Sequence, residues 1–393
     1  MIYETPVLDE RELAAIAAVE GLRTELQGRV AGPRRWIGGM RRLQYARAVQ
    51  GSNSIEGYDA ALDDVMAAID GEETLDAEAE TVQALQGYRD AMTYVLQLAD
   101  EDDLVIDESL VKALHFMIMK YDLSKSPGRW RRGPIWVQRE LDGAVVYDGP
   151  PADEVSQLVT EMLDQLSGAT ESNVMVRAAM AHLNLVLVHP FRDGNGRMAR
   201  CLQTLVLTRE KILAPVFSSI EEYLGRNTPA YYAVLAEVGQ GAWSPHNSAR
   251  PWVRFSLTAH YRQAQTLLHR VRESEELWEA CAEVARRRRL PDRSAGPMFD
   301  AARGLRIRNG TYRATVRASD GDEISEQLAS RDLRLLVDAG ILAPQGETRG
   351  RFYVATPELS GTWTAIRQRR PARTVSDDLF GGQETLPFGP LRS

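Results

Sequence analysis

Twelve consecutive residues carry side chains suited to attack on a phosphate. They read His189-Pro190-Phe191-Arg192-Asp193-Gly194-Asn195-Gly196-Arg197-Met198-Ala199-Arg200. An apolar stretch ends at Val188, Pro190 stops a helix there, and the glycines and asparagine that follow favour a tight loop. A helix then continues to about residue 209. A glycine-rich loop entering a helix N-terminus offers unpaired backbone N–H groups and a positive dipole end, which together form a phosphate cradle.

The side chains of this segment fit the same ligand. Arg197 and Arg200 are three residues apart on one helix face, so both can pair with phosphate oxygens. Asp193 offers the hard oxygen that a phosphate-bound Mg²⁺ requires, and His189 can serve as general base near neutral pH. A lone Gly-Asn-Gly or a lone histidine is usually structural. The combination predicts a site for attack by a hydroxyl on a phosphate.

The elements that position this segment have mainly helical spacing of apolar residues. We expect helices at 8–30, 33–55, 60–69, 77–98, 108–120, 152–166, 174–188, 195–209, 229–238 and 251–271. Residues 135–138 and 144–147 are instead β-prone and flank Asp142-Gly143, which predicts a hairpin. A lone hairpin is not a free-standing sheet, so it either decorates the helical body or forms a flap over a site.

Length and composition narrow the class of protein. The 393 residues suggest two or three domains, and the net charge of −8 argues against a surface covered in positive charge for nucleic acid. Cys201 and Cys281 are the two cysteines and lack metal-ligand spacing, which fits a reducing compartment. No signal peptide or membrane-spanning run is evident, so we expect a cytoplasmic protein with no membrane partner.

The composition changes after about Glu276. From there to Arg370 the chain has 17 arginines, no lysine and 13 acidic residues, which suggests a separate domain. A predicted helix at 324–340 followed by two short strands resembles a winged helix-turn-helix. Five side chains on it could reach a DNA groove: Ser325, Gln327, Ser330, Arg331 and Arg334. The alternative is a protein-interaction or dimer-packing domain.

Residues 371–393 read as a flexible tail. Within it, residues 383–388 vaguely resemble short motifs that dock on the bacterial replication clamp.

The twelve-residue segment resembles the signature of the Fic (Fido) family, H-P-F-x-[D/E]-G-N-G-R-x-x-R, at every fixed position. The resemblance implies a mainly α fold with a β-hairpin flap, and transfer of AMP from ATP to a Ser, Thr or Tyr hydroxyl of a target protein. It implies a role for each motif residue: His189 as general base, Asp193 as the Mg²⁺ ligand, Gly194, Asn195 and Gly196 as binders of the α- and β-phosphates, and Arg197 and Arg200 as partners of the triphosphate. Relatives that transfer phosphate instead carry a lysine in this loop, where this chain has Gly196.

The resemblance extends over roughly residues 35–270. Residues 126–131, the hairpin and Pro150-Pro151 look like the flap that pairs with the target's backbone. Tyr231-Tyr232 resembles the paired tyrosines near the nucleoside, with Tyr232 as the contact; ordinary packing is the alternative. Some relatives have a polar residue where this chain has Gly239. We expect an N-terminal helical region at 1–110, a Fic core at 111–275, a winged-helix-like domain at 276–370 and a tail at 371–393. A homodimer is suggested by the resemblance alone.

A second segment, Ser52-Asn53-Ser54-Ile55-Glu56-Gly57, reads by itself as an ordinary helix end closed by glycine. It resembles the family's inhibitory motif, [S/T]-x-x-x-E-[G/N], at all three fixed positions. The resemblance implies that Glu56 pairs with Arg200 and keeps this arginine from the γ-phosphate, so that ATP binds with its α-phosphate misaligned. We therefore expect low resting activity. The same site could also remove AMP, with Glu56 positioning a water.

Two other functions compete with AMP transfer. The chain could be a DNA-binding regulator whose Fic core is a nucleotide sensor. The intact His189, Asp193 and Arg200 argue against a catalytically inactive core. Phosphoryl transfer is the other alternative, and Gly196 disfavours it.

Overall fold

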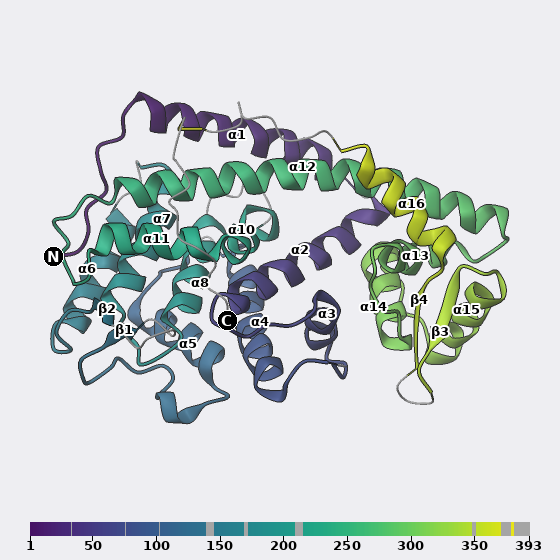
Figure 1. Cartoon of the computed structure of the whole chain (residues 1–393), viewed down its shortest axis with the longest axis horizontal. Helices are drawn as coiled ribbons and strands as arrows, with labels where there is room; N and C mark the ends of the chain where they lie inside the picture. Colours follow the sequence, from purple (N-terminus) through teal and green to yellow (C-terminus); the bar gives the residue numbers. More distant parts are fainter. Residues whose placement is uncertain are drawn as a thin grey trace.

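The computed structural model describes residues 1–32, 34–74, 76–101, 103–138, 145–168, 172–208, 215–347, 351–370 and 379–380. Helices make up most of this structure, and two separate two-stranded antiparallel ribbons complete it (Figure 1). The prediction of a mainly α fold with a hairpin is confirmed. None of the described helices is long and apolar enough to cross a membrane.

The first and larger part of the chain is a body of packed helices. Its helices are α1 (Glu10–Val30), α2 (Arg35–Ser54), α3 (Leu62–Asp70), α4 (Ala79–Leu98), α5 (Glu108–Met119), α6 (Val155–Gly168), α7 (Val174–Val188), α8 (Asn195–Thr208), α9 (Pro215–Ser218), α10 (Glu221–Arg226), α11 (Thr228–Gly239) and α12 (Arg250–Arg287), with a short 3₁₀ turn at Leu123–Lys125. The long α12 lies beside α1 along one side of the body (Figure 1). It continues well beyond the predicted end at 271, because Leu277, Cys281 and Ala285 repeat every four residues and are buried.

The centre of this body is the pair α7 and α8, which the twelve-residue segment connects. Both helices are buried on almost all sides, because α7 also packs against α6 and α12 while α8 packs against α4 and α5. A helix surrounded in this way has apolar residues around its whole circumference rather than on one stripe. The loop between the two helices is therefore held at both ends by buried helices.

The first ribbon consists of β1 (Trp136–Gln138) and β2 (Val145–Asp148), with Trp136 opposite Asp148. The predicted turn at Asp142-Gly143 lies outside the described residues. The Tyr147 hydroxyl donates to Leu187 O at 2.6 Å, which fixes β2 to the end of α7. The other edge of β2 bonds to residues 241–243. Among the described residues, no strand pairs with the outer edge of β1.

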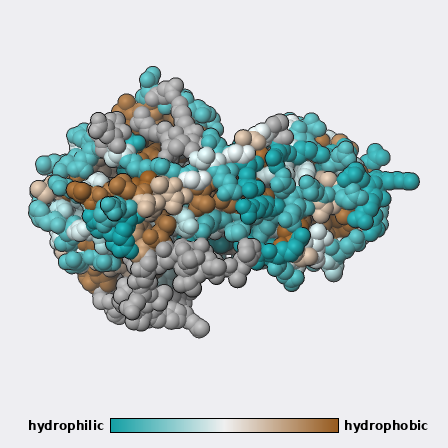
Figure 2. Space-filling model, turned by 90° about the horizontal axis from the view of Figure 1, so that it is seen from above, coloured by the Kyte–Doolittle hydropathy of each residue, from teal (hydrophilic) through white to brown (hydrophobic). Residues whose placement is uncertain are grey.

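The last part of the chain forms a smaller lobe with a largely hydrophilic surface (Figure 2). We call residues 295–368 the C-terminal unit. It contains α13 (Ala295–Ala302), α14 (Asn309–Asp320), α15 (Glu326–Asp338), β3 (Leu342–Gln345), β4 (Phe352–Ala355) and α16 (Pro357–Gln368), and it follows a 3₁₀ turn at Asp292–Ser294. The helix α15 and the ribbon of β3 and β4 match the predicted helix at 324–340 and the two short strands after it, whereas α13 and α14 were not predicted. The winged-helix assignment itself stays a prediction. The change in composition near 276 falls inside α12 rather than in a linker.

Two residues of the predicted tail are described. Phe380 is buried against α1 and α12, where Arg11 donates to its carbonyl oxygen and the Arg254 guanidinium lies 5.3 Å from the centre of its ring. The segment 383–388, compared above with clamp-binding motifs, lies outside the described residues.

Candidate active site

The loop between α7 and α8 is shaped largely by its own residues. His189 ends α7 with a left-handed backbone, φ 51°, and Gly194 has φ 74°. The Asn195 side chain accepts from Phe191 N and donates to Phe191 O, both at 2.9 Å. This amide is thus engaged within the loop, so anion binding depends on the unpaired backbone N–H groups that begin α8.

His189 is held in the tautomer that a general base needs. Its Nδ1 lies 3.1 Å from Val186 O, which can only accept, so Nδ1 carries the proton and Nε2 keeps its lone pair. Burial lowers the pKa of His189 because the charged imidazolium loses solvation. The ring is therefore neutral and able to accept a proton at pH 7.

Arg131 ties the flap to the loop, a role that sequence reasoning missed. Its Nε donates to His189 O at 2.9 Å, its Nη2 to Pro150 O at 2.6 Å and its Nη1 to Gly133 O at 2.8 Å. Its backbone N–H also donates to Pro190 O at 2.9 Å. One buried guanidinium thus connects the base of the flap to the carbonyl of the candidate base. The position of Arg131 at the end of the flap segment 126–131 was the only signal in the sequence.

His115 on α5 is a second residue that the sequence analysis did not single out. It stacks flat on Phe191 at a centroid distance of 3.6 Å. Its Nδ1 accepts from Gly128 N and its Nε2 donates to Asp193 O, both at 2.9 Å. Burial lowers its pKa to about 4, so the ring stays neutral. A polar residue on the apolar face of α5 was the available hint.

Asp193 lies at the rim of the cradle and is partly exposed. Its Oδ1 accepts from Gly194 N at 2.6 Å, and its Oδ2 pairs with Lys125 Nζ at 3.1 Å. Among the described residues no group of three His, Cys, Asp or Glu side chains could hold a metal alone. One exposed carboxylate beside an anion cradle suits a Mg²⁺ held mainly by nucleotide phosphates and water. Asp193 fits that ion, provided that Lys125 gives up its contact.

The segment 52–58 covers the start of α8. Glu56 Oε1 accepts from Arg200 Nη2 at 2.6 Å, and Ser52 accepts from the same guanidinium through Oγ and its backbone oxygen, both at 2.8 Å. The Arg200 side chain is fully buried. The structure thus brings Ser52, Glu56 and Arg200 together in one cluster.

The Glu56 carboxylate lies directly over Gly196. A Cβ added at Gly196 would lie 2.2 Å from Glu56 Oε1, far closer than any real contact. Arg200 Nη1 would lie 3.1 Å from the same Cβ, and it has no hydrogen-bond partner among the described residues. An acidic side chain therefore covers the helix start that would cradle phosphate, next to a buried cationic donor that is still free.

Arg197 faces a different set of partners. Its Nη1 donates to the Tyr121 hydroxyl at 3.1 Å, its Nη2 lies 2.9 Å from Met119 Sδ, and its guanidinium lies 4.9 Å from the centre of the Tyr58 ring. The two arginines thus share a helix, but both are occupied by neighbouring side chains. Tyr58 follows Gly57 directly, so residues 52–58 contact both Arg197 and Arg200.

The paired tyrosines differ in burial, although their ring centres lie 5.4 Å apart. Tyr231 is buried and bonds to His182 Nε2 at 3.0 Å, whereas Tyr232 is 42% exposed and donates to Ile55 O at 3.1 Å. Packing thus accounts for the burial of Tyr231, while Tyr232 lies at the surface beside residues 52–58. The Gly239 noted above packs against the Tyr147 ring.

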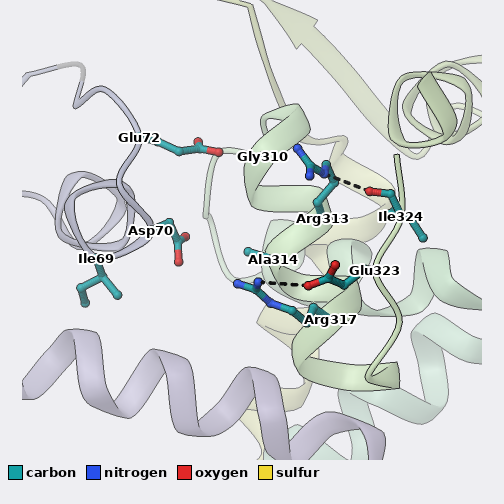
Figure 3. A pocket seen from close by; sticks show the side chains of 9 residues that line it. All are labelled: Ile69, Asp70, Glu72, Gly310, Arg313, Ala314, Arg317, Glu323 and Ile324. Atoms are coloured by element: carbon teal, nitrogen blue, oxygen red, sulfur yellow. Dashed lines mark hydrogen bonds and ion pairs between the residues drawn. The ribbon is translucent and has the colours of Figure 1, made fainter. Parts of the chain in front are cut away.

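A pocket of about 430 Å³ lies apart from the signature loop, between the end of α3 and α14. Figure 3 shows it with its charged lining. The lining residues are Ile69, Asp70, Glu72, Gly310, Arg313, Ala314, Arg317, Glu323 and Ile324.

Comparisons with known proteins agree with this site. Residues 105–207 match the Fic/DOC family, and this range holds the flap and the whole signature. The chain is 30% identical over 158 residues to the protein adenylyltransferase fic-1 of Caenorhabditis elegans, covering 40% of this chain and 27% of that protein. It is 26% identical over 252 residues to the protein adenylyltransferase Fic of Drosophila willistoni, covering 63% of this chain and 46% of that protein.

The chain thus spans between about a quarter and a half of the length of these two curated relatives. A Fic family protein from Desulfovibrio desulfuricans has a similar fold, with a TM-score of 0.56 at 22% identity, covering 90% of this chain and 98% of that one. Residues 105–207 are thus similar to the Fic/DOC family, and the described fold resembles that of a Fic family protein.

Proposed function

We propose that this protein transfers AMP from ATP to a hydroxyl side chain of a target protein. The observation that carries the proposal is the loop at 189–196, which places a neutral histidine with a free Nε2 beside an anion cradle at a helix start. The curated relatives, named as protein adenylyltransferases, support the same reaction.

In this reaction the target oxygen attacks the α-phosphorus of ATP, and its proton passes to His189 Nε2. The bond from the α-phosphorus to the bridging oxygen breaks, and pyrophosphate leaves. The N–H groups of Asn195 and Gly196 and the guanidinium groups of Arg197 and Arg200 hold the phosphates, and the Gly194 N–H joins them once it leaves Asp193 Oδ1. A Mg²⁺ held by Asp193 would neutralise charge on the phosphate oxygens. Tyr232 borders the nucleoside.

The flap is suited to receive a protein. No described strand pairs with the outer edge of β1, and Trp136 and Val145 are each 53% exposed. An extended target segment can add to such an edge through backbone hydrogen bonds. Its hydroxyl would then be presented to His189, which Arg131 connects to the flap.

Glu56 acts as an internal inhibitor in this proposal. Its carboxylate over Gly196 occupies the place of a phosphate and engages Arg200 in a charge-assisted bond, which is strong when partly buried. With Glu56 docked, a side chain at position 196 would collide with its carboxylate, so a lysine like that of phosphate-transferring relatives would require Glu56 to move. The same carboxylate could position a water for removal of AMP from a modified target.

The transferred group can be tested directly. We expect the Glu56→Gly enzyme with Mg²⁺ to label protein from ATP carrying ³²P at the α-phosphate and not at the γ-phosphate. The enzyme with Glu56→Gly and His189→Ala should give no label. Label from the γ-phosphate would show phosphoryl transfer, and no label at all with ATP bound would favour a nucleotide sensor.

DNA binding by the C-terminal unit is a second candidate, favoured by the exposed face of α15. Gln327, Arg331 and Arg334 are exposed, and these two arginines form no ion pair with a described residue. Ser325 instead caps α15, and Ser330 bonds to Asn309. We expect duplex DNA to bind with a salt-dependent affinity that falls in the Arg331→Ala, Arg334→Ala double variant. Equal shifts of both proteins in a mobility assay would exclude this helix as the contact.

A further inference from the structure

One uninterrupted helix, α2, connects the candidate active site to the C-terminal unit. Its twenty residues run without proline from Arg35 to Ser54. The N-terminal half packs on α13 and α14, while the C-terminal half packs on α4, α8 and α10 (Figure 1). Ser52 lies fourteen residues after Gly38, about 21 Å along the axis at the usual helical rise.

The contact with the C-terminal unit is close and charged. A Cβ added at Gly38 would lie 1.7 Å from Ala318 O on α14, so the two backbones touch there. Arg35 holds Asp320 through two bonds, of 2.7 and 3.0 Å. Such close backbone contact leaves little freedom for α14 to move without moving α2.

A buried arginine strengthens this junction. Arg42 donates to Asp300 on α13 at 3.2 Å and to Thr315 on α14 at 3.1 Å, and it also pairs with Asp70 at the end of α3. Asp70 lines the pocket between α3 and α14 (Figure 3). The position of α2 is therefore linked to the geometry of that pocket.

The other end of α2 is held as closely. A Cβ at Gly51 would lie 2.5 Å from Glu221 O on α10, and Gly225 would meet Gly51 at 2.6 Å. The next residue, Ser52, binds Arg200. A packed helix with fixed contacts at both ends moves as a unit rather than deforming continuously.

We propose that α2 is a lever through which the C-terminal unit sets the position of Ser52 and Glu56 against Arg200. A displacement of the C-terminal unit at Gly38 shifts α2, weakens the cluster at Arg200 and releases AMP transfer. The C-terminal unit is then the regulatory input to the Fic site. This inference rests on the proposed inhibitory role of Glu56.

The lever is tested by adding a methyl group to α2 where it contacts the C-terminal unit. Gly38→Ala pushes α2 away from Ala318, and Gly21→Ala on α1 is the matched control, because a Cβ at Gly21 meets nothing within 4 Å. We expect Gly38→Ala to raise self-labelling from α-³²P ATP about three- to tenfold in the chain with Glu56 and by less than twofold in the Glu56→Gly chain. Gly21→Ala should change neither.

Amide hydrogen exchange of residues 50–57 gives a second readout that needs no activity. Gly38→Ala should speed this exchange, and Gly21→Ala should not. Unchanged exchange and labelling in folded Gly38→Ala protein would overturn the lever, as would an equal effect on labelling with and without Glu56. If Glu56→Gly fails to raise labelling, the inhibitory role fails, and the exchange result still decides the lever.

A charge exchange covers the case in which Gly38→Ala does not fold. Arg35→Asp should raise labelling about two- to fivefold, the effect of losing an exposed two-bond ion pair, and Arg35→Asp with Asp320→Arg should restore the low rate. Arg29→Asp, which breaks the exposed pair with Glu25 inside α1, is the control. Failure of the paired exchange to restore the low rate would argue against coupling through this junction.

Discussion

Two segments meet at the start of α8, and they are held in different ways. The signature loop at 189–196 is fixed by buried hydrogen bonds to its backbone, from Arg131, His115 and the Asn195 side chain. The segment 52–58 is fixed by contacts to side chains that also have a proposed ligand, chiefly Glu56 to Arg200. In the proposed function the first segment is the frame of the site, and the second is a cover that the phosphates of ATP would have to displace. On that proposal the site can be fully assembled and still inactive.

The largest effect should follow from loss of the base within the frame. In the Glu56→Gly background, His189→Ala should lower kcat/KM for AMP transfer roughly 10²- to 10⁴-fold, the usual contribution of general base catalysis. His269→Ala on α12 is the control. Retention of more than a tenth of the activity would show that His189 is not the base.

Arg131 tests whether the frame depends on bonds to its backbone. Arg131→Ala in the Glu56→Gly background should lower kcat about 10- to 100-fold with a smaller change in KM for ATP, because misplacement of the base costs turnover. Arg132→Ala, its exposed neighbour, should have little effect. Equal losses in both variants would indicate a general electrostatic effect instead.

Acid should lower the free energy of unfolding by favouring protonation of His115, which holds the signature loop. Its pKa is about 4 in the folded protein and about 6.5 when unfolded. The contribution of His115 to the free energy of unfolding is therefore full above pH 6.5. It falls as the pH drops toward 4, because His115 takes up a proton in the unfolded chain before it does so in the folded protein. Full loss of this contribution would lower the free energy of unfolding by about 3 kcal/mol. In urea unfolding, His115→Gln should reduce the fall in unfolding free energy between pH 7 and 4, while the exposed His246→Gln should not. Identical slopes in both variants would refute this assignment.

The smallest effect should follow from loss of the hydrogen bond between Tyr232 and the segment 52–58. Tyr232→Phe removes the hydrogen bond to Ile55 O but keeps the ring, so about 1 kcal/mol of contact is lost. We expect basal labelling to rise roughly two- to fivefold, with no increase in the Glu56→Gly background. A rise in both backgrounds would place the effect on nucleotide binding rather than on the cover.

Much of the site was predictable because its chemistry is concentrated in one short segment. The spacing from His189 to Arg200 predicted a helix, a turn and a second helix, and these elements are present. The predicted helices 108–120 and 174–188 match α5 and α7 closely, because buried helices repeat apolar residues in long runs.

The remainder depends on contacts between distant residues, which spacing does not reveal. Arg131 reaches His189 across 58 positions, and His115 reaches Asp193 across 78. The length of α12 was missed, because its charged outer face hides the apolar repeat beyond Val271. The short helices α9 and α10 and the helices α13, α14 and α16 were also not predicted, because they are short or polar and take their stability from packing.

The rate of self-labelling from α-³²P ATP in the Glu56→Gly chain tests the central claim most directly. The wild-type chain and Asp59→Gly, which removes an exposed carboxylate three residues further on, serve as controls. Loss of a charge-assisted bond to a buried arginine predicts a rate roughly 10- to 100-fold above wild type, with Asp59→Gly unchanged. Equal rates in all three proteins, with ATP bound in each, would contradict inhibition of an assembled AMP-transfer site by Glu56.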